Sequence, residues 1–289
     1  MKYRLIAIDL DGTLLDERHH VPLRNREAIR RAHDAGLRVV LCTGRSFSES
    51  RPILRQLEVE LDATVTVGGA LLTDARTGRT IESFAFSAEL ARAVGDWFRA
   101  REFTLLWLHD AHTCGSDGFA IAGPRLHPAV TRWLAEAPVA MTRVAAIPAE
   151  FPPALRISVV DEPAHLAETA EALAATFGPR VAHNVIHVPA YEFTVIETFA
   201  GRVDKWQGLR RLCERWDIDE SQTVAIGDDV NDVPMLASAG WGVALENARP
   251  AAKAAASSIA PSNRDCGVAH VIEQLLNGEA PPPRDASRG

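Results

Sequence analysis

Two aspartates separated by a single residue follow an apolar run near the start of the chain. The run Leu5 to Ile8 has the composition of a buried strand, and Asp9, Asp11 and Gly12 come directly after it. Because successive side chains of a strand point to opposite sides, Asp9 and Asp11 share one side at its C-terminal edge. In open parallel sheets that edge is where ligands bind. The alternative is an Asp-Gly turn that closes a hairpin and leaves both acids in solvent.

Polar groups also follow two later apolar segments. The predicted strand Leu37 to Cys42 ends in Thr43, Gly44 and Arg45, and a hydroxyl with backbone amides in such a loop can hold a phosphate. The segment Thr223 to Ile226 is a second predicted strand, and it ends in an acidic loop. Three buried strands that each end in polar groups favour a binding site over a hairpin turn.

The acids at these strand ends predict a magnesium site. Asp228 follows the later strand, and Asp232 lies one helical turn further. With Asp9 and Asp11 they supply the oxygen ligands that a hard cation prefers, while positions stay open for water and phosphate. Clustered carboxylates repel one another and any phosphate unless a cation is present, and Lys205, near the start of a predicted helix, can offset part of this charge.

The order of the predicted elements indicates an α/β chain with an insertion. Residues 5–67 alternate strand, helix, strand, helix and strand with short connections, which implies right-handed parallel crossovers and a Rossmann-like parallel-sheet core. We expect a core domain of residues 1–84 and 190–277 and an inserted α+β domain of residues 85–189. The tail, residues 278–289, is rich in Pro, Arg, Asp and Ser and is predicted to be disordered.

Composition narrows the class of protein. The 289 residues are 47% hydrophobic and 24% charged, which is typical of a soluble globular protein. A net charge of −7 argues against nucleic acid as the main partner, because nucleic-acid affinity depends on neutralising phosphates. We expect no membrane span and no signal peptide. The four cysteines are scattered without a Cys-x-x-Cys pair, so a reducing cytoplasm is the expected compartment.

In their order along the chain these motifs resemble the four motifs of the haloacid dehalogenase superfamily. Their surroundings resemble its Cof-type phosphatase branch, which carries a large α/β cap between motifs II and III. The matching residues are Asp9-x-Asp11-Gly12-Thr13, Thr43-Gly44-Arg45, Lys205 and Gly227-Asp228-Asp229-x-Asn231-Asp232. Two later stretches also fit, namely Glu246-Asn247-Ala248 followed by Lys253, and Ser262 to Ala269. The resemblance extends to about Leu276 and is weak inside the cap.

The resemblance implies a magnesium-dependent phosphatase that forms an aspartyl-phosphate on Asp9. Asp11 would protonate the leaving oxygen and then activate water. The main-chain carbonyl of Asp11 and the carboxylates of Asp9 and Asp228 would bind Mg²⁺. The substrate would be a small phosphorylated metabolite, either a sugar phosphate or a phosphorylated cofactor.

The same resemblance implies roles for the remaining motif residues. Lys205 would stabilise charge on the nucleophile and the phosphoryl group, and Asp232 would orient Lys205 or a metal-bound water. Thr43, Gly44 and Arg45 would bind the phosphate, and Asn231 would reach it as well. For Arg45 the sequence leaves open a structural role, in which it pairs with a nearby acid.

Two departures from the branch accompany these matches. Gly68-Gly69 stands where Asn-Gly is usual, so a side-chain amide is missing, and Trp206 follows Lys205 where Gly is common. Two alternative functions stay open, a sugar phosphomutase of the same superfamily and a non-catalytic protein that binds a phosphorylated ligand. The sequence does not identify the phosphate ester, the cap residues that set specificity, or whether the protein is a monomer or a homodimer.

Overall fold

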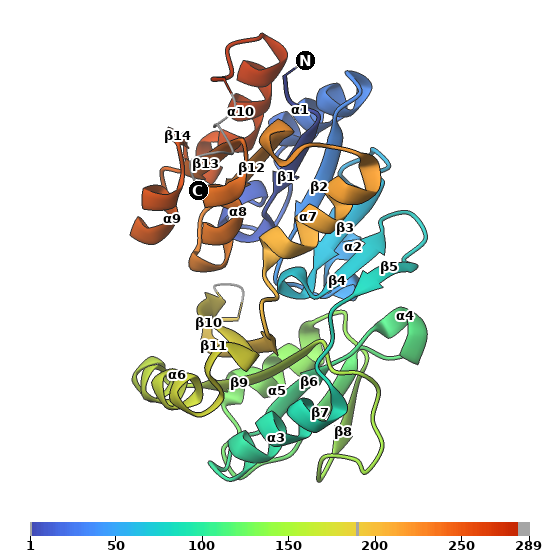
Figure 1. The fold of residues 1–289 in the computed structure, drawn as a ribbon, viewed down its shortest axis with the longest axis vertical. Coiled ribbons are helices and arrows are strands. Elements are labelled where there is room, and N and C mark those ends of the chain that lie inside the picture. Colours follow the sequence, from blue (N-terminus) through green and yellow to red (C-terminus); the bar gives the residue numbers. More distant parts are fainter. Residues whose placement is uncertain (1, 189–190, 283–289) are drawn as a thin grey trace. The chain divides into compact units, whose positions relative to one another are not determined.

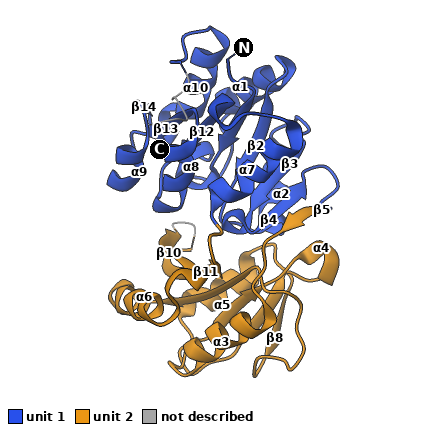
Figure 2. Ribbon diagram, viewed as in Figure 1, with its two compact units in different colours: residues 1–79, 204–289 blue, residues 80–203 orange. Residues whose placement is uncertain are grey.

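The computed structural model describes residues 2–188 and 191–282, which divide into two compact units (Figures 1 and 2). One unit contains the described residues of 1–79 and 204–289, and the other contains those of 80–203. The divisions follow residues 79 and 203, whereas the sequence analysis placed them after residues 84 and 189. Of the predicted disordered tail, residues 283–289 lie outside the described residues, and the Pro281 carbonyl accepts a hydrogen bond of 2.9 Å from the Tyr3 hydroxyl.

The first unit is built on a sheet with the strand order β14-β13-β12-β1-β2-β3-β4. All neighbouring strands are parallel except β3 and β4, which are antiparallel. The strands are β1 (Leu5–Ile8), β2 (Arg38–Cys42), β3 (Ala63–Thr66), β4 (Leu71–Asp74), β12 (Thr223–Gly227), β13 (Trp241–Leu245) and β14 (Ser258–Ala260). The helices of this unit are α1 (Leu23–Asp34), α2 (Phe47–Gln56), α7 (Lys205–Trp216), α8 (Val233–Ser238), α9 (Pro250–Ala255) and α10 (Gly267–Leu276).

Strand β1 lies in the middle of this sheet, between β2 and β12. Its four residues are buried, as expected for a continuous apolar run that is covered on both faces. Ile8 is in register with Leu41 of β2 and Ile226 of β12. The residues that follow these three strands therefore leave the sheet at the same edge, which places the predicted polar loops together.

Helices cover both faces of the sheet. Side chains of α1, α2 and α10 join Ile6, Ile8, Val39 and Leu41 in one apolar cluster on one face. Helix α7 contacts β3 and helix α8 contacts β12 and β13, and both are drawn in front of the sheet in Figure 1. This doubly covered parallel sheet is the α/β core predicted from the sequence.

The second unit contains a sheet with the strand order β10-β11-β9-β6-β7-β8. Its neighbouring strands are antiparallel except for β7 and β8. The strands of this unit are β5 (Thr80–Ser83), β6 (Leu105–Leu108), β7 (Gly118–Ile121), β8 (Met141–Val144), β9 (Arg156–Asp161), β10 (Val181–Val188) and β11 (Phe193–Ala200). Its helices are α3 (Ala88–Arg99), α4 (Ala111–Cys114), α5 (Pro128–Glu136) and α6 (Pro163–Phe177). Two apolar clusters cover the sheet. One includes side chains of α3 and α6, and the other includes side chains of α5.

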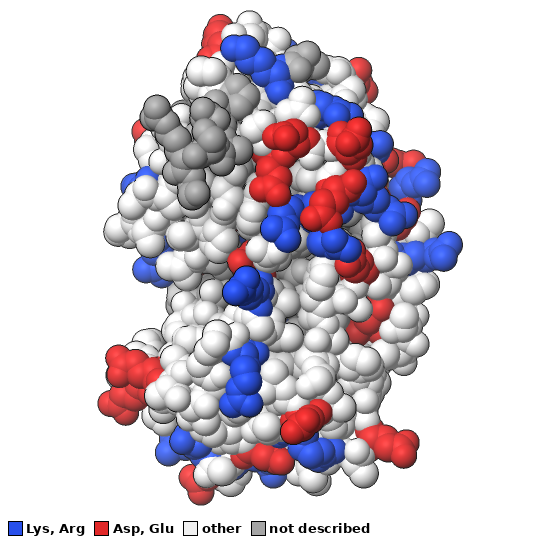
Figure 3. All heavy atoms as spheres, in the orientation of Figure 1, with Lys and Arg blue, Asp and Glu red and all other residues white. Residues whose placement is uncertain are grey.

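Charged side chains of both signs are interspersed over the first unit on the face drawn in Figure 3. The same view shows fewer of them over the second unit. Of the helices in the described part of the chain, none has the length and apolar character that a bilayer span requires.

Candidate active site

The carboxyl end of β1 positions Asp9 inside the first unit. The Asp9 amide donates to the Ile226 carbonyl at 3.0 Å and so extends the pairing of β1 with β12 by one residue. The side chain of Asp9 follows the strand into a buried position, with 5% of the residue exposed. A wide turn over Leu10–Leu14 comes next, and the Leu14 amide donates back to the Asp9 carbonyl at 3.2 Å.

Gly12 lets this turn pack against Asp228, the residue that follows β12. Gly12 has a φ of +78°, and a Cβ on it would lie 2.3 Å from Oδ2 of Asp228. Any side chain here would displace the carboxylate, so glycine is required both for the φ and for the close approach. The hydroxyl of Thr13 donates to Oδ1 of Asp228 at 2.8 Å. Together these contacts fix the Asp228 carboxylate beside the turn.

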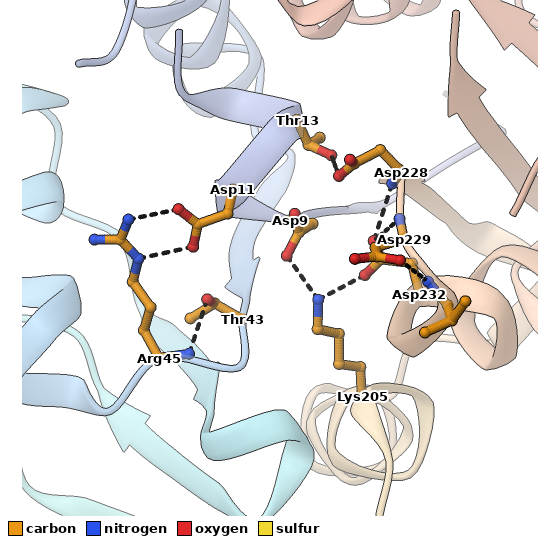
Figure 4. Close-up of polar contacts among 10 residues, drawn as sticks. Asp9, Asp11, Thr13, Thr43, Arg45, Lys205, Asp228, Asp229 and Asp232 are labelled. Atoms are coloured by element: carbon orange, nitrogen blue, oxygen red, sulfur yellow. Dashed lines mark hydrogen bonds and ion pairs between the residues drawn. The ribbon is translucent and has the colours of Figure 1, made fainter. Parts of the chain in front are cut away.

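Lys205 joins the acids from the opposite side (Figure 4). It is the first residue of α7, and 1% of it is exposed. Its Nζ donates to Oδ1 of Asp9 and to Oδ1 of Asp232, at 2.6 Å each. A buried ammonium that bridges two buried carboxylates offsets their mutual repulsion.

The start of α7 is fixed by its own cap and by a close backbone contact. The Asp204 side chain accepts from the Gln207 amide at 2.8 Å and caps the helix. A Cβ on Gly69 would lie 2.0 Å from the Asp204 carbonyl oxygen, so the turn after β3 packs directly against this cap. Gly68, which replaces the usual Asn, has a φ of +64° and donates its amide to the Thr43 carbonyl at 3.0 Å.

Asp232 is fully buried and uses both carboxylate oxygens within the protein. Oδ1 accepts from Lys205, and Oδ2 accepts from the amides of Asp228 and Asp229 at 2.9 and 3.1 Å. This carboxylate therefore shapes the loop after β12 and holds the lysine. Although its atoms lie within 4.8 Å of ligand atoms of Asp9 and Asp228, these bonds leave it poorly suited to coordinate a cation directly.

Asp11 and Arg45 form a separate ion pair at the side of this cluster (Figure 4). Nε and one terminal nitrogen of Arg45 donate to the two oxygens of Asp11 at 2.8 and 2.5 Å. The Arg45 amide donates to the Thr43 hydroxyl oxygen at 3.1 Å. The structure thus contains the ion pair of Arg45 with an acid that the sequence analysis had left open, and Asp11 is that acid.

The remaining predicted phosphate ligands lie in the same loops. Thr43 is buried, and it does not cap α2, because Ser46 occupies that position in a reciprocal capping box with Glu49. Gly44 lies between Thr43 and Arg45. Asn231 lies in the turn Val230–Asp232 after β12, and among the described residues its side chain has no hydrogen bond. Sequence reasoning missed the contact of Thr13 with Asp228 and a contact of Asn247 with the Gly12 carbonyl, at 2.8 Å, because neither pair is close in sequence.

The electrostatics of the cluster favour a bound cation. Burial, and next the charge of Asp232, raise the pKa of Asp9 well above its ordinary value. The same two causes raise the pKa of Asp228 to about 7. Burial alone would lower the pKa of Lys205, but the carboxylates of Asp232 and Asp9 outweigh it and raise the pKa. One lysine thus leaves part of the negative charge of three acids uncompensated.

These residues fit a magnesium ion. Hard divalent cations take carboxylate and carbonyl oxygens, and Asp9 and Asp228 present such oxygens at neighbouring strand ends. The missing Cβ of Gly12 allows the Asp228 carboxylate to lie against the turn that carries the Asp11 carbonyl. Burial, and next the repulsion between the acids, raise the pKa values of Asp9 and Asp228, and a cation at this position would relieve that repulsion.

In the absence of a divalent cation, we expect Asp228 to make the protein less stable as the pH rises. Its pKa is raised from 3.8 to about 7 in the folded chain. Between these values the folded state binds more protons than the unfolded state, so the free energy of unfolding falls with increasing pH. Urea titrations in EDTA should measure this trend at about pH 5 and about pH 8. Asp228→Asn removes the titrating group, so the stability difference between wild type and this variant should change with pH; a constant difference would contradict the prediction.

The comparisons with known proteins agree with this geometry. A family model described as haloacid dehalogenase-like hydrolase matches residues 6–272. The chain belongs to this family. Phosphatase YwpJ from Bacillus subtilis is 29% identical over 303 residues, which cover 94% of this chain and 100% of YwpJ. The 5-amino-6-(5-phospho-D-ribitylamino)uracil phosphatase YwtE, also from Bacillus subtilis, is 28% identical over 293 residues and covers 96% and 99%.

A solved haloacid dehalogenase-like hydrolase from B. subtilis has the same fold. It superposes with a TM-score of 0.79 at 24% identity and covers 94% of this chain and 100% of that chain. Three predictions are therefore confirmed: the Cof-type haloacid dehalogenase resemblance, the α/β fold class, and an enzyme of the phosphatase kind. The roles of individual residues of the present chain stay predictions.

Proposed function

We propose that this chain is a magnesium-dependent phosphatase that hydrolyses a small phosphorylated metabolite through an aspartyl-phosphate on Asp9. The observation that carries the proposal is the buried network in which Lys205 bridges Asp9 and Asp232, with Asp228 fixed beside it by Thr13. The residues of the four sequence motifs lie at one edge of the sheet. Some of them belong to this network, and the others lie beside it. Family membership and the named activities of YwpJ and YwtE support the reaction class.

In the first step Asp9 would attack phosphorus. Lys205 donates to Oδ1 of Asp9, so Oδ2 is the oxygen that we assign as the nucleophile. A bond forms between Oδ2 and phosphorus while the bond from phosphorus to the ester oxygen breaks, and the leaving oxygen takes a proton from Asp11. Lys205 holds the orientation of Asp9 throughout. The bound Mg²⁺, held by Asp9, Asp228 and the Asp11 carbonyl, would neutralise charge on the phosphoryl oxygens.

In the second step a water would attack the phosphoryl group and release Asp9. Asp11 accepts the proton of that water, which regenerates both carboxyl groups in their starting forms. This cycle needs Asp11 to carry a proton for part of the time, yet Arg45 pairs with both of its oxygens in the structure. We therefore propose that the Arg45 guanidinium transfers to the phosphoryl group when substrate binds, which frees Asp11 and adds a phosphate ligand.

A small phosphorylated polyol, sugar or cofactor is the substrate class that we propose. YwtE is named for a phosphorylated ribitylamino-uracil, which is a small phosphate ester of this kind. Thr43 and Lys205 are buried and Arg45 is half-buried, which suits a single phosphoryl group rather than a polymer backbone. We further propose that the protein acts in the cytoplasm, as the sequence leads us to expect, and that it is a monomer or a homodimer.

The decisive experiment is a phosphate-release assay on the purified chain. With Mg²⁺, the wild type should release phosphate from p-nitrophenyl phosphate and from at least one ester in a panel of sugar phosphates and phosphorylated cofactors. EDTA should stop the release, and fresh Mg²⁺ should restore it. Silence across the whole panel would exclude the proposed function. Phosphorus NMR can follow the products of a sugar phosphate over time. If a sugar-phosphate isomer appears before free phosphate, a phosphomutase is favoured instead.

A further inference from the structure

Three asparagines from distant parts of the first unit hold carbonyl groups within and directly after the turn Leu10–Leu14 that follows Asp9. Nδ2 of Asn247 donates to the Gly12 carbonyl at 2.8 Å. Nδ2 of Asn25 donates to the Leu14 carbonyl at 3.1 Å, and Nδ2 of Asn263 donates to the Leu15 carbonyl at 2.9 Å. A turn with few regular backbone hydrogen bonds thus receives its partners from side chains.

These asparagines are themselves tied to the C-terminal part of the unit. The Asn263 amide donates to Oδ1 of Asn247 at 3.0 Å, so Asn247 is held at both ends of its side-chain amide. The Ala269 amide, in α10, donates to Oδ1 of Asn25 at 3.0 Å. Asn247 follows β13, and Asn263 precedes α10, so these contacts connect the loop after β13 and the start of α10 to the turn after β1.

Asn247 differs from the other two in what it holds and where it lies. Its target, Gly12, is the residue of the turn with the widest conformational freedom, and it lies against the Asp228 carboxylate. The peptide between Asp11 and Gly12 carries the Asp11 carbonyl, and its orientation is set by ψ of Asp11 together with φ of Gly12. Asn247 is exposed, whereas Asn25 is fully buried and Asn263 is 9% exposed. An exposed amide adds little to packing, so stability alone does not explain its two hydrogen bonds.

We propose that Asn247 is a positioning residue for the metal site. By fixing the Gly12 carbonyl it holds Gly12 in its left-handed conformation, and through Gly12 it fixes the Asp11 carbonyl and the space that the Asp228 carboxylate occupies. Without Asn247 these oxygens would have to become ordered when the cation binds, at a cost to affinity. The proposal rests on the proposed function for the identity of the metal, Mg²⁺, and of its oxygen ligands.

Asn247→Ala tests the proposal through binding of Mg²⁺ alone. We expect the Kd for Mg²⁺, measured by calorimetry without substrate, to rise about two- to tenfold, which corresponds to one hydrogen bond. The thermal midpoint of the metal-free variant should stay close to that of the wild type, because Asn247 is exposed. At saturating Mg²⁺, kcat and KM for p-nitrophenyl phosphate should return to wild-type values. An unchanged Kd for Mg²⁺ would overturn the proposal.

Asn25→Ser is the matched control, because Asn25 also holds a carbonyl of this turn. Asn25 is buried and contacts Leu14, two residues beyond Gly12, so this variant should lose stability and keep its Mg²⁺ affinity. Equal loss of Mg²⁺ affinity in both variants would show general loosening of the turn and would overturn the specific role of Asn247. The test separates failure of the proposed function from failure of the proposal for Asn247. A wild-type chain that binds Mg²⁺ but releases no phosphate is not a phosphatase, and the effect of Asn247→Ala on the Kd for Mg²⁺ can still be measured. A wild type that binds no Mg²⁺ overturns the proposal for Asn247.

Discussion

Replacing Asp9 by asparagine is expected to reduce phosphate release by on the order of 10⁴-fold or more. Asparagine has the same shape, so its Oδ1 can still accept from Lys205, but its side-chain amide does not attack phosphorus to give a hydrolysable ester. Loss of the nucleophile removes the reaction path itself, whereas loss of an orienting contact only slows it. We therefore expect Asp9→Asn to have the largest effect of any single conservative change in the site.

The measurement is kcat for p-nitrophenyl phosphate at saturating Mg²⁺, together with the thermal midpoint of each protein. Asp229→Asn is a suitable control, since Asp229 lies in the neighbouring loop and its Oδ1 accepts from the Val230 amide at 2.7 Å, a bond that an asparagine oxygen can keep. The control should retain activity and stability. If Asp9→Asn keeps more than about one-tenth of the wild-type kcat, Asp9 is not the nucleophile.

Replacing Lys205 by methionine is expected to cost about 3–5 kcal/mol of the free energy of unfolding at neutral pH, because it leaves buried carboxylates without their cation. Lys205 is 1% exposed, and its Nζ contacts both Asp9 and Asp232 at 2.6 Å. Methionine fills a similar volume, so the loss measures charge rather than packing. The loss should become smaller in acid, because the raised pKa of Asp9 allows it to become neutral there.

Urea unfolding in EDTA measures this loss, with Lys253→Met as the matched substitution. Lys253 is exposed on α9, and its replacement should change stability by less than about 0.5 kcal/mol. Equal stabilities of the two variants would mean that Lys205 does not compensate the acids in the folded chain. Addition of Mg²⁺ should recover part of the loss in Lys205→Met, since a cation then takes over the neutralisation of Asp9.

The strand-end motifs were predictable because each is local. An apolar run such as Leu5 to Ile8 predicts a buried strand that ends just before Asp9. The parallel topology of the sheet then brings the ends of β1, β2 and β12 to one edge. The short strands β8 and β14 were not predicted. Met141–Val144 and Ser258–Ala260 lie at sheet edges and carry polar or half-exposed residues, so their strand pattern is weak.

Other features of the fold and the site depend on which segments, distant in sequence, lie together in the structure. The sequence pattern does not predict these long-range contacts. The expected core domain included residues 190–277, yet β11, an alternating apolar strand, pairs with β9 and β10 in the second unit. Alternation identifies a strand but not its sheet. Likewise the ion pair of Arg45 with Asp11 and the bond from Asn247 to Gly12 follow from side-chain directions at the site, which motif spacing leaves undetermined.

The place of β1 has a consequence for synthesis of the protein on the ribosome. One neighbour of β1, strand β2, emerges soon after it, but the other, β12, is encoded more than two hundred residues later, as the separation of 215 between Thr13 and Asp228 shows. At about 5–20 residues per second, the nascent chain carries an unpaired apolar strand edge for roughly 10 to 40 s. That open edge is a template for pairing with other chains. We therefore expect the growing chain to need protection by a chaperone until β12 leaves the ribosome, and a slowed elongation rate to increase its aggregation.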